Sequence, residues 1–473
     1  MKHFLTLALV AAIALGSCRK LVVDNNGSNN GGGGNNGGGN DNGTTITLEG
    51  KITSDTVLRA KNVYILKGLV YIKNNAKITI EAGTVIKGAY LDPIGGLIIT
   101  RGSKIIAEGT ADKPIIFTSN SPSPRSGDWA GIVLLGKALT NAAFNGTAGL
   151  GEIEGGVNNA DGDGLYGGTD DNDNSGIMKY VRIEYAGFAF LPDKEINSLT
   201  MGGVGKGTVI DHIQTFYAKD DAFEWFGGSV DCKYLIAYKT QDDDFDTDNG
   251  FRGKIQFGLI IRDSLIADLS NSESFESDND ANGSALAPQT GAIFSNITSI
   301  GPLATLQNNG SSLYLAGAQI RRNSAISIFN SVFVGWPTGI LIDGSKGRFT
   351  ELNIADSTLR IRNSIIAGCK TGVKYAANTS TPSGYTDAQV QAWFTNPYFG
   401  NSILTNVTDA KMVNPFNAAS FDPTPFGTSP LATGGTFTDP KLAGFTAVTF
   451  RGAINPGGAA DANWWKGWTR YDN

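Results

Sequence analysis

The chain contains almost no histidine and little cysteine. Of its 473 residues, two are histidines, His3 and His212, and three are cysteines. His3 falls in the leader described below, so a Ser-His-Asp triad would have to use His212, which we expect to be an ordinary strand histidine. Zinc sites need closely spaced His or Cys ligands, and the sequence has no such group. Histidine-based catalysis is therefore disfavoured, and a zinc site built from His or Cys is excluded.

The scarcity of cysteine also limits covalent cross-links. Beyond Cys18, only Cys232 and Cys369 remain, each in an apolar, strand-like run. A disulfide is possible in an exported protein, but two buried, unlinked thiols are favoured when the cysteines lie far apart in apolar runs.

Positive charge and long apolar runs are scarce as well. The chain has 38 Lys and Arg against 44 Asp and Glu, a net charge of −6. This balance argues against a nucleic-acid surface and against a polybasic membrane patch. Beyond the N-terminus, no apolar run is long enough to cross a bilayer. We therefore expect no nucleic-acid partner and no membrane-spanning segment.

Residues 1–17 are typical of a secretory signal peptide. The apolar run Phe4–Leu15 follows the positive charge of Lys2 and is too short to span a membrane. It ends in LGSC (15–18), which resembles the lipobox of bacterial lipoproteins. That resemblance implies cleavage after residue 17 and acyl chains on Cys18. In the alternative, an ordinary secretory peptide, Cys18 is incidental.

Residues 18–44 are predicted to be a flexible tether. Asn25 to Gly43 are almost entirely glycine and asparagine, so this segment has no apolar surface to bury. A Gly-rich coil of this length has an r.m.s. reach of roughly 25 Å. We therefore expect an exported domain that is lipid-anchored to the outer membrane and exposed at the cell surface.

The rest of the chain reads as all-β. It is rich in glycine, helical periodicity is nearly absent, and short runs of Val, Ile, Phe and Tyr alternate with turn residues. A sandwich, a propeller and a solenoid all fit that pattern, and internal repeats distinguish them.

Repeats in the second half favour a solenoid. The segments GAIFSNITSIG, SIFNSVFVG and LRIRNSIIAG place Asn296, Asn330 and Asn363 at intervals of 34 and 33 residues. This interval matches one coil of a parallel β-helix, in which equivalent side chains stack at about 4.8 Å. Asparagines stacked at a turn can hydrogen-bond to one another, and parallel crossovers are right-handed in nearly all cases. The prediction is a right-handed parallel β-helix.

The N-terminal coils carry a family resemblance. The segments AKITIEAGTVIKG and GLIITRGSKIIAEGTADKPIIFTS resemble the first coils of large β-helical lipoproteins from Bacteroidetes-type bacteria, in the pectin-lyase-like superfamily. The resemblance covers 45–375. It implies the fold but no single function, because the superfamily includes lyases, hydrolases, esterases and adhesins. Known export signals of these bacteria are acidic just after the cysteine. Here Arg19 and Lys20 follow, which leaves the periplasmic face open as an alternative.

Residues 376–473 are predicted to cap the solenoid. A solenoid leaves its last coil as an open edge that needs a cover. Asp387 to Phe394 is the best helical segment, and Trp464, Trp465 and Trp468 end the chain. We expect the tryptophans to cover the last coil, with a sugar-stacking platform as the alternative.

The strongest chemical signal is acidic. KDDAFEWFGG, QDDDFDTDNG and SESFESDNDANG align on Phe223, Phe245 and Phe275, which are 22 and 30 residues apart. Stacked carboxylates must bind cations or take up protons, and all-oxygen ligands suit Ca²⁺. In the alternative, the acids are solvated turn residues paired with Lys219, Lys233, Lys239, Lys254 and Arg252. The alignment predicts three files of metal ligands: Glu224, Asp246 and Glu276; Asp248 and Asp278; Asp221, Asp243 and Glu273.

A second acidic stretch, DGDGLYGGTDDND (161–173), is a weaker calcium candidate. It lacks the Glu that closes an EF-hand loop, and its flanks are not helical.

Three classes of function fit these features. The leading hypothesis is a surface lipoprotein that binds a polysaccharide or assists an outer-membrane transporter. The second is an enzyme: a glycoside hydrolase using paired carboxylates, or a calcium-dependent polysaccharide lyase. Lyases of this fold place a basic residue beside the calcium, and Arg262, Arg321 and Arg322 are the candidates here, although no lyase motif matches. The third is a structural or adhesive solenoid.

Overall fold

The computed structural model describes residues 22–24, 43–191, 194–308, 310–458 and 460–472. The predicted signal peptide and Cys18 lie outside the described residues. Within the segment predicted to be a tether, Val22–Asp24 forms β1, which pairs antiparallel with β2 (Thr45–Ile52). Within the described ranges, no helix is both long and apolar enough to cross a membrane.

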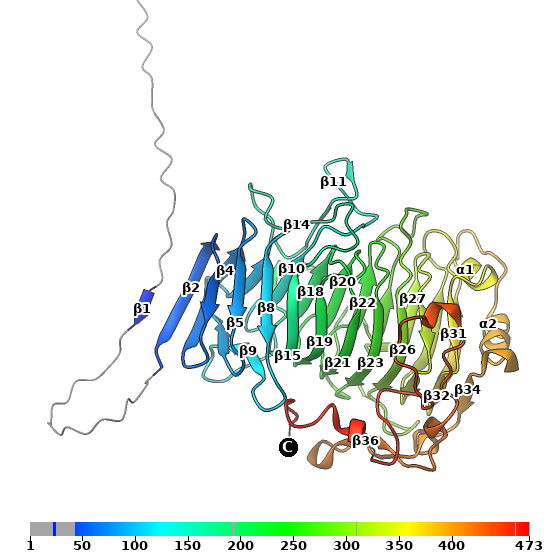
Figure 1. The fold of residues 1–473 in the computed structure, drawn as a ribbon. Coiled ribbons are helices and arrows are strands. Elements are labelled where there is room, and N and C mark those ends of the chain that lie inside the picture. Colours follow the sequence, from blue (N-terminus) through cyan, green and yellow to red (C-terminus); the bar gives the residue numbers. More distant parts are fainter. Residues whose placement is uncertain (1–21, 25–42, 192–193, 309, 459, 473) are drawn as a thin grey trace, which may run out of the picture.

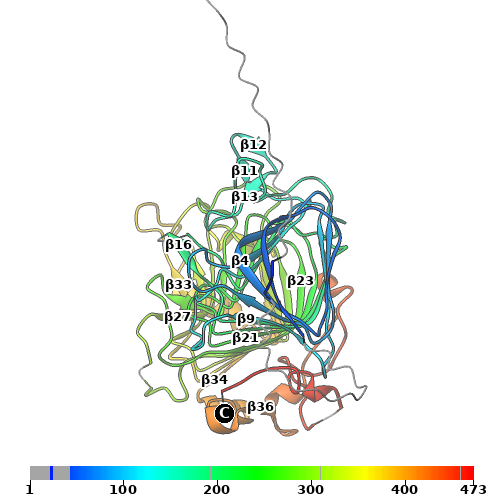
Figure 2. The ribbon, with the colours of Figure 1, turned by 90° about the vertical axis from the view of Figure 1, so that its left-hand side faces the viewer.

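The body is a right-handed parallel β-helix, as predicted. Its strands lie side by side along the solenoid in Figure 1, and Figure 2 looks along the stack. Parallel register between successive coils defines three faces, here named A, B and C.

Face A contains β2 and the strands β4 (Val63–Ile72), β6 (Val85–Gly88), β9 (Ile115–Ser119), β15 (Gly176–Glu184), β19 (Val209–Phe216), β21 (Cys232–Tyr238), β23 (Lys254–Ile261), β26 (Ile293–Ile300), β29 (Val332–Val334), β32 (Ile365–Ala367) and β34 (Ser402–Leu404). Some of these strands also extend onto a neighbouring face: β4, β15, β19, β21, β23 and β26. Face B continues from the second half of β4 through β7 (Gly96–Ile99), β10 (Ile132–Leu135), β18 (Leu199–Gly202), β20 (Phe223–Phe226), β22 (Phe245–Asp248), β25 (Phe275–Ser277), β27 (Tyr314–Arg321), β30 (Thr338–Asp343) and β33 (Thr371–Ala376). Face C consists of the first halves of β15, β19, β21, β23 and β26, together with β3 (Thr56–Leu58), β5 (Lys77–Ile80), β8 (Lys104–Glu108), β28 (Ser327–Phe329) and β31 (Arg360–Arg362).

Insertions between the strands extend outward from the coils. Residues 136–175, between β10 and β15, rise above the coils in Figure 1 and pack Ile153, Val157 and Tyr166 onto the outer side of face B. The remaining strands and α-helices are β11 (Ala143–Phe144), β12 (Thr147–Ala148), β13 (Gly151–Glu152), β14 (Leu165–Tyr166), β16 (Ala189–Leu191), β17 (Lys194–Glu195), β24 (Ser272–Glu273), β35 (Met412–Asn414), β36 (Asp422–Pro425), α1 (Leu352–Ala355) and α2 (Asp387–Phe394). Short 3-10 helices follow in the C-terminal region: Pro397–Phe399, Val407–Ala410, Ala418–Ser420, Pro430–Ala432, Pro440–Leu442 and Ala460–Asn463.

The predicted asparagine column lies at the bend from face C to face A. Asn296, Asn330 and Asn363 occupy equivalent positions with φ of 60°, 51° and 54°, a conformation that asparagine tolerates well. The expected bonds along the stack are replaced by bonds to the C-terminal segment. Nδ2 of Asn296 donates to the Phe450 carbonyl, and Nδ2 of Asn330 to the Thr436 carbonyl, both at 3.0 Å.

His212 belongs to the same column of bend residues, with a φ of 54°. Its ring stacks between Tyr180 and Tyr234, with centroids 4.3 Å from each, and its Nδ1 faces Asp211. The only histidine of the described residues therefore has a structural position at a bend.

The interior contains the predicted aromatic stack. Phe223, Phe245 and Phe275 are fully buried, and their successive ring centroids lie 5.7 and 5.4 Å apart. Cys232 and Cys369 are unlinked thiols, as expected, although Cys369 is only partly buried.

The C-terminal region does more than cap the last coil. Helix α2 buries Val390 and Phe394 against the end of the solenoid. Trp465 and Trp468, 2 % and 1 % exposed, lie instead along the outer side of face A. The prediction that the tryptophans cover the last coil is therefore wrong.

The physical reason is the character of face A. Its outward side is apolar from Phe216 through Ile236, Leu259 and Ile300, so it needs its own cover. The C-terminal segment returns along this face to the earlier coils (Figure 1). There Nη1 of Arg470 donates to Glu184 at 2.9 Å.

Candidate functional site

An acidic groove of about 620 Å³ lies on the outer side of face B. Inward residues of β20 and β22 fill the core, so the alternate residues of these strands face the groove. The 136–175 insertion and β17 contribute Glu154 and Glu195 to its lining. Twelve carboxylates line it: Glu154, Glu195, Asp220, Asp221, Glu224, Asp242, Asp243, Asp246, Asp248, Asp268, Glu276 and Asp278. Three cations, Lys219, Arg321 and Arg322, line it with them.

Strand register assembles the predicted files. Glu224 pairs with Asp246, and Asp246 with Glu276, on successive strands. In another file, the backbone N–H of Asp243 donates to Asp221 at 2.9 Å, and that of Glu273 donates to Asp243 at 2.6 Å. Of the eight predicted ligands, all except the buried Glu273 line the groove.

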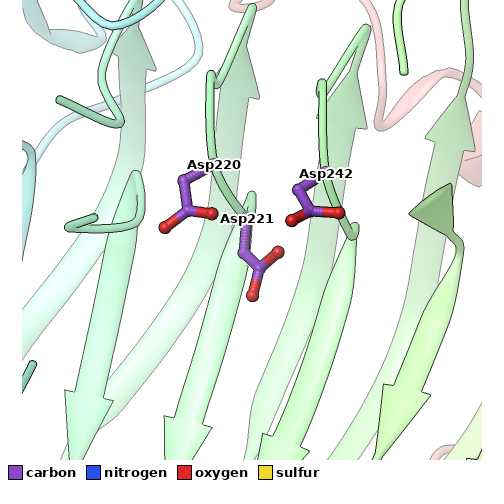
Figure 3. A group of neighbouring side chains, drawn as sticks. All are labelled: Asp220, Asp221 and Asp242. Carbon is purple, nitrogen blue, oxygen red and sulfur yellow. The ribbon is translucent and has the colours of Figure 1, made fainter. Parts of the chain in front are cut away.

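Three groups of carboxylates each bring one oxygen per residue within 4.8 Å of the others. Asp221, Glu224 and Asp246 form one group, and Asp243, Glu273 and Glu276 form another. The third, Asp220, Asp221 and Asp242, is drawn in Figure 3, where the three side chains lie close together beside the strand starts.

Asp220 and Asp242 were not predicted from the sequence as part of the site. Both occupy the same place in their repeats, directly before the predicted Asp221 and Asp243. The paired DD in KDDAF and QDDDF was the available signal, because adjacent acids at a turn, rather than on a strand, can converge on one point.

Burial and mutual repulsion raise the pKa values of the carboxyl groups in these three sets. Burial is the largest cause, and neighbouring carboxylates add to it. The pKa rises to about 7 for Asp242 and Glu276 and to about 8 for Glu273, and lies well above its usual range for Asp221 and Asp246. Near neutral pH the cluster must therefore retain protons or acquire cations.

Two arginines neutralise one end of the groove. Nε of Arg321 donates to Asp278 at 2.9 Å and its Nη2 to Glu276, while Nη1 of Arg322 donates to Asp278 at 2.7 Å. Burial works against the Arg321 cation, but these carboxylates raise its pKa above the usual value. Arg321 and Arg322 thus act as charge partners and are poorly suited to accept a proton.

Arg262 lies elsewhere. Its side chain is fully buried, pairs with Asp244 at 3.0 Å, and stacks over Tyr314. The suggestion that Arg262 serves as a catalytic base beside the groove is therefore wrong, because an enclosed, paired guanidinium reaches no substrate.

The alternative that these acids are solvated turn residues does not fit the structure. Asp221 and Glu224 are buried, and of the proposed partner cations only Lys219 lines the groove. The others bond elsewhere: Lys233 to Thr446, Lys239 to Asp263 and Asp472, Lys254 to the Ala443 carbonyl, and Arg252 to Asp171.

In the second acidic stretch, the weaker calcium candidate, lysine side chains lie beside the carboxylates. Nζ of Lys73 lies 2.7 Å from Asp163 and 3.0 Å from Asp161, and Lys51 also reaches both carboxylates. Bonds from Lys51 and Lys73 lower the pKa of Asp161 to about 2. This loop is an ion-pair network between the insertion and the first coils.

One face of the parallel β-helix therefore has a groove lined by stacked carboxylates, of which Glu276 and Asp278 are paired with arginines. Residues 50–408 match the family model described as a pectate-lyase like beta helix domain. The chain belongs to this family. Neither curated proteins nor solved structures give a match to the chain. Membership of the pectate-lyase-like family defines the architecture, whereas the chemistry depends on the residues that line the groove.

Proposed function

We propose that the groove binds calcium and, through it, an acidic polysaccharide. The observation that supports this most is the set of three carboxylate groups, each with oxygens within 4.8 Å of one another. Such a set is stable in its ionised form only if positive charge is added to it.

The donor set fits a hard divalent cation. All its ligand atoms are carboxylate oxygens, which Ca²⁺ prefers. Oδ1 of Asp246 is buried and has no hydrogen-bond partner among the described residues, so it is available as a ligand. Asp221, Glu224 and Asp246 would hold one ion, and Asp243, Glu273 and Glu276 another.

The character of the lining favours an acidic ligand over a neutral one. Phe226 is the single aromatic among the described lining residues, so stacking against sugar rings contributes little. A bound cation and the adjacent arginines would together attract carboxylate or sulfate groups. The polysaccharide would therefore bind through its charge.

The test is a binding screen with pectate, alginate and glycosaminoglycan oligosaccharides, with calcium and with EDTA. We expect calcium-dependent binding that is lost in Asp246→Asn and retained in the control Asp161→Asn, whose carboxylate lies in the lysine network. Binding that is equal in EDTA would contradict the proposal, and failure to bind any glycan would favour a structural or adhesive role.

Hydrolysis is the second candidate, and one observation favours it. A pKa of about 7, as for Asp242 and Glu276, suits a general acid, and glycosidases use pairs of nearby carboxyl groups. Release of reducing ends that disappears in Asp242→Asn would establish it. A lyase is less favoured, because Arg321 is held protonated.

The location is likewise a proposal. A lipid on Cys18 would hold the protein at the outer membrane, exposed at the cell surface, where it could pass the polysaccharide to a transporter. Cys18→Ala should move the protein to the soluble fraction and abolish palmitate labelling, and retention of the variant in washed membranes would contradict the assignment.

A further inference from the structure

A cationic cluster lies on the outer side of face C, near the C-terminal end of the solenoid. Arg360 and Arg362 belong to β31, and Lys441 belongs to the C-terminal segment that crosses this face. Nη1 of Arg360 and Nη1 of Arg362 both donate to the Asp439 carboxylate, at 2.8 and 2.9 Å. Two guanidinium groups thus share one carboxylate, and they have further N–H donors for another acceptor.

The pKa of Lys441 is affected by the positive charge of the neighbouring arginines. Its Nζ lies 2.8 Å from Oγ of Ser327 and contacts the Thr358 carbonyl. Burial, followed by the charge of Arg360, lowers the pKa of Lys441 to about 8. The three cations of the cluster, Arg360, Arg362 and Lys441, outnumber the two carboxylates that act on Lys441, Asp439 and Asp356. Its charge imbalance is therefore opposite to that of the groove on face B.

Aromatic rings adjoin these arginines. The guanidinium carbon of Arg362 lies 5.7 Å from the ring centre of Tyr398 and 5.3 Å from that of Phe399. Tyr398 is 80 % exposed, and Trp393 and Phe399 line a small cavity together with the two arginines. An open aromatic ring beside a guanidinium offers one surface for the apolar side of a sugar ring and one donor pair for its acidic group.

We propose that this cluster is a second ligand site, which binds an acidic sugar residue. Arg360 and Arg362 donate to its carboxylate or sulfate, and Tyr398 stacks against its ring. The site lies on a different face from the groove, uses no metal, and does not depend on calcium binding there.

The test is titration of the full-length protein with a heparin tetrasaccharide, a galacturonate tetrasaccharide and inorganic sulfate, all in EDTA to remove any cation from the groove. We expect saccharide binding that Arg362→Gln weakens by about tenfold or more, since it loses charge-assisted bonds. Tyr398→Ala should weaken saccharide binding and leave sulfate binding unchanged. Lys233→Gln, a face-C cation bound to Thr446, is the matched control and should change nothing.

The outcomes separate the alternatives. Absence of EDTA-resistant saccharide binding overturns the site, as does equal weakening by Lys233→Gln, which indicates general electrostatic attraction. Loss in Arg362→Gln with no effect of Tyr398→Ala overturns the sugar assignment and leaves an oxyanion site. Because Arg362 also neutralises Asp439, its variant is accompanied by a melting curve, and the exposed Tyr398 tests the same site independently.

Discussion

Two acidic regions of this protein look alike in composition and differ in their charge partners. In the 161–173 loop, Asp161 and Asp163 each contact Lys51 and Lys73 of the first coils. In the groove on face B, twelve carboxylates and three cations of the described residues form the lining, and both arginines lie beside Glu276 and Asp278. The first region is neutralised by the protein itself, and the second is left for protons or a ligand to neutralise.

The lysine-paired Asp161 and Asp163 and the buried carboxyl groups of the three sets in the groove consequently shift their pKa values in opposite directions. Burial alone would raise the pKa of Asp163, but the hydrogen bonds from Lys73 and Asn159, together with the charges of Lys73 and Lys51, outweigh it and the net shift is downward. For Asp242 and Asp246 in the groove, burial and the repulsion of neighbouring carboxylates act together, so their pKa values rise. Local acidity therefore says little about a cation site until the neighbouring charges are known.

The largest expected effect is a pH dependence of stability in EDTA. Groups whose pKa is raised on folding bind more protons in the native state, so stability falls as pH rises from about 4 to about 8. For Asp242, Glu276 and Glu273, with pKa values of about 7, 7 and 8, the combined loss between pH 5 and pH 8 should be several kcal/mol. Denaturant unfolding at pH 5 and pH 8 measures it, and equal stability at both would contradict the charge imbalance.

Calcium should produce the next largest effect. A ligand that binds only the folded state adds about 2.7 kcal/mol at a hundredfold excess over its Kd. The melting temperature at pH 8 should therefore rise with calcium, and Asp246→Asn should reduce the increase. Asp161→Asn should leave the increase intact, and a melting curve that chelation does not alter would remove calcium from the proposal.

The smallest effect is the sharpest comparison: the same substitution should act with opposite sign in the two regions. Asp163→Asn leaves Lys51 and Lys73 without their buried partner and should cost about 1–2 kcal/mol. Asp246→Asn in EDTA at pH 8 removes one repelling charge and should stabilise by about 1 kcal/mol. Chemical denaturation of both variants checks this, and destabilisation by Asp246→Asn in EDTA would indicate that its ionised form is already compensated.

Much of the fold and part of the site could be predicted because the coil repeats in the sequence. The sequence alignment on Phe223, Phe245 and Phe275 matches the register in which β20, β22 and β25 pair. It therefore predicted the file formed by Glu224, Asp246 and Glu276. Asp220 and Asp242 were missed because the third repeat has Ser272 at the equivalent position, so they form no file of three acids in the sequence.

Contacts between distant segments escaped prediction. The asparagine column was expected to bond to itself, but the returning C-terminal segment supplies carbonyl acceptors. Trp465 and Trp468 were expected to cover the last coil, but they pack against the apolar outer side of face A. The position of each depends on where the chain end runs, which no local pattern specifies.

The sequence by itself determined the parallel β-helix, the stacking of its aromatic core and the vertical alignment of the acids, because each follows from residues one coil apart. Only the tertiary structure decided which acids meet a cation. Lys73 and Asp163 are 90 residues apart, and Arg321 reaches Glu276 across 45. Charge compensation acts through space over a few ångströms, so it depends on which segments the fold brings together rather than on how many charges a segment contains.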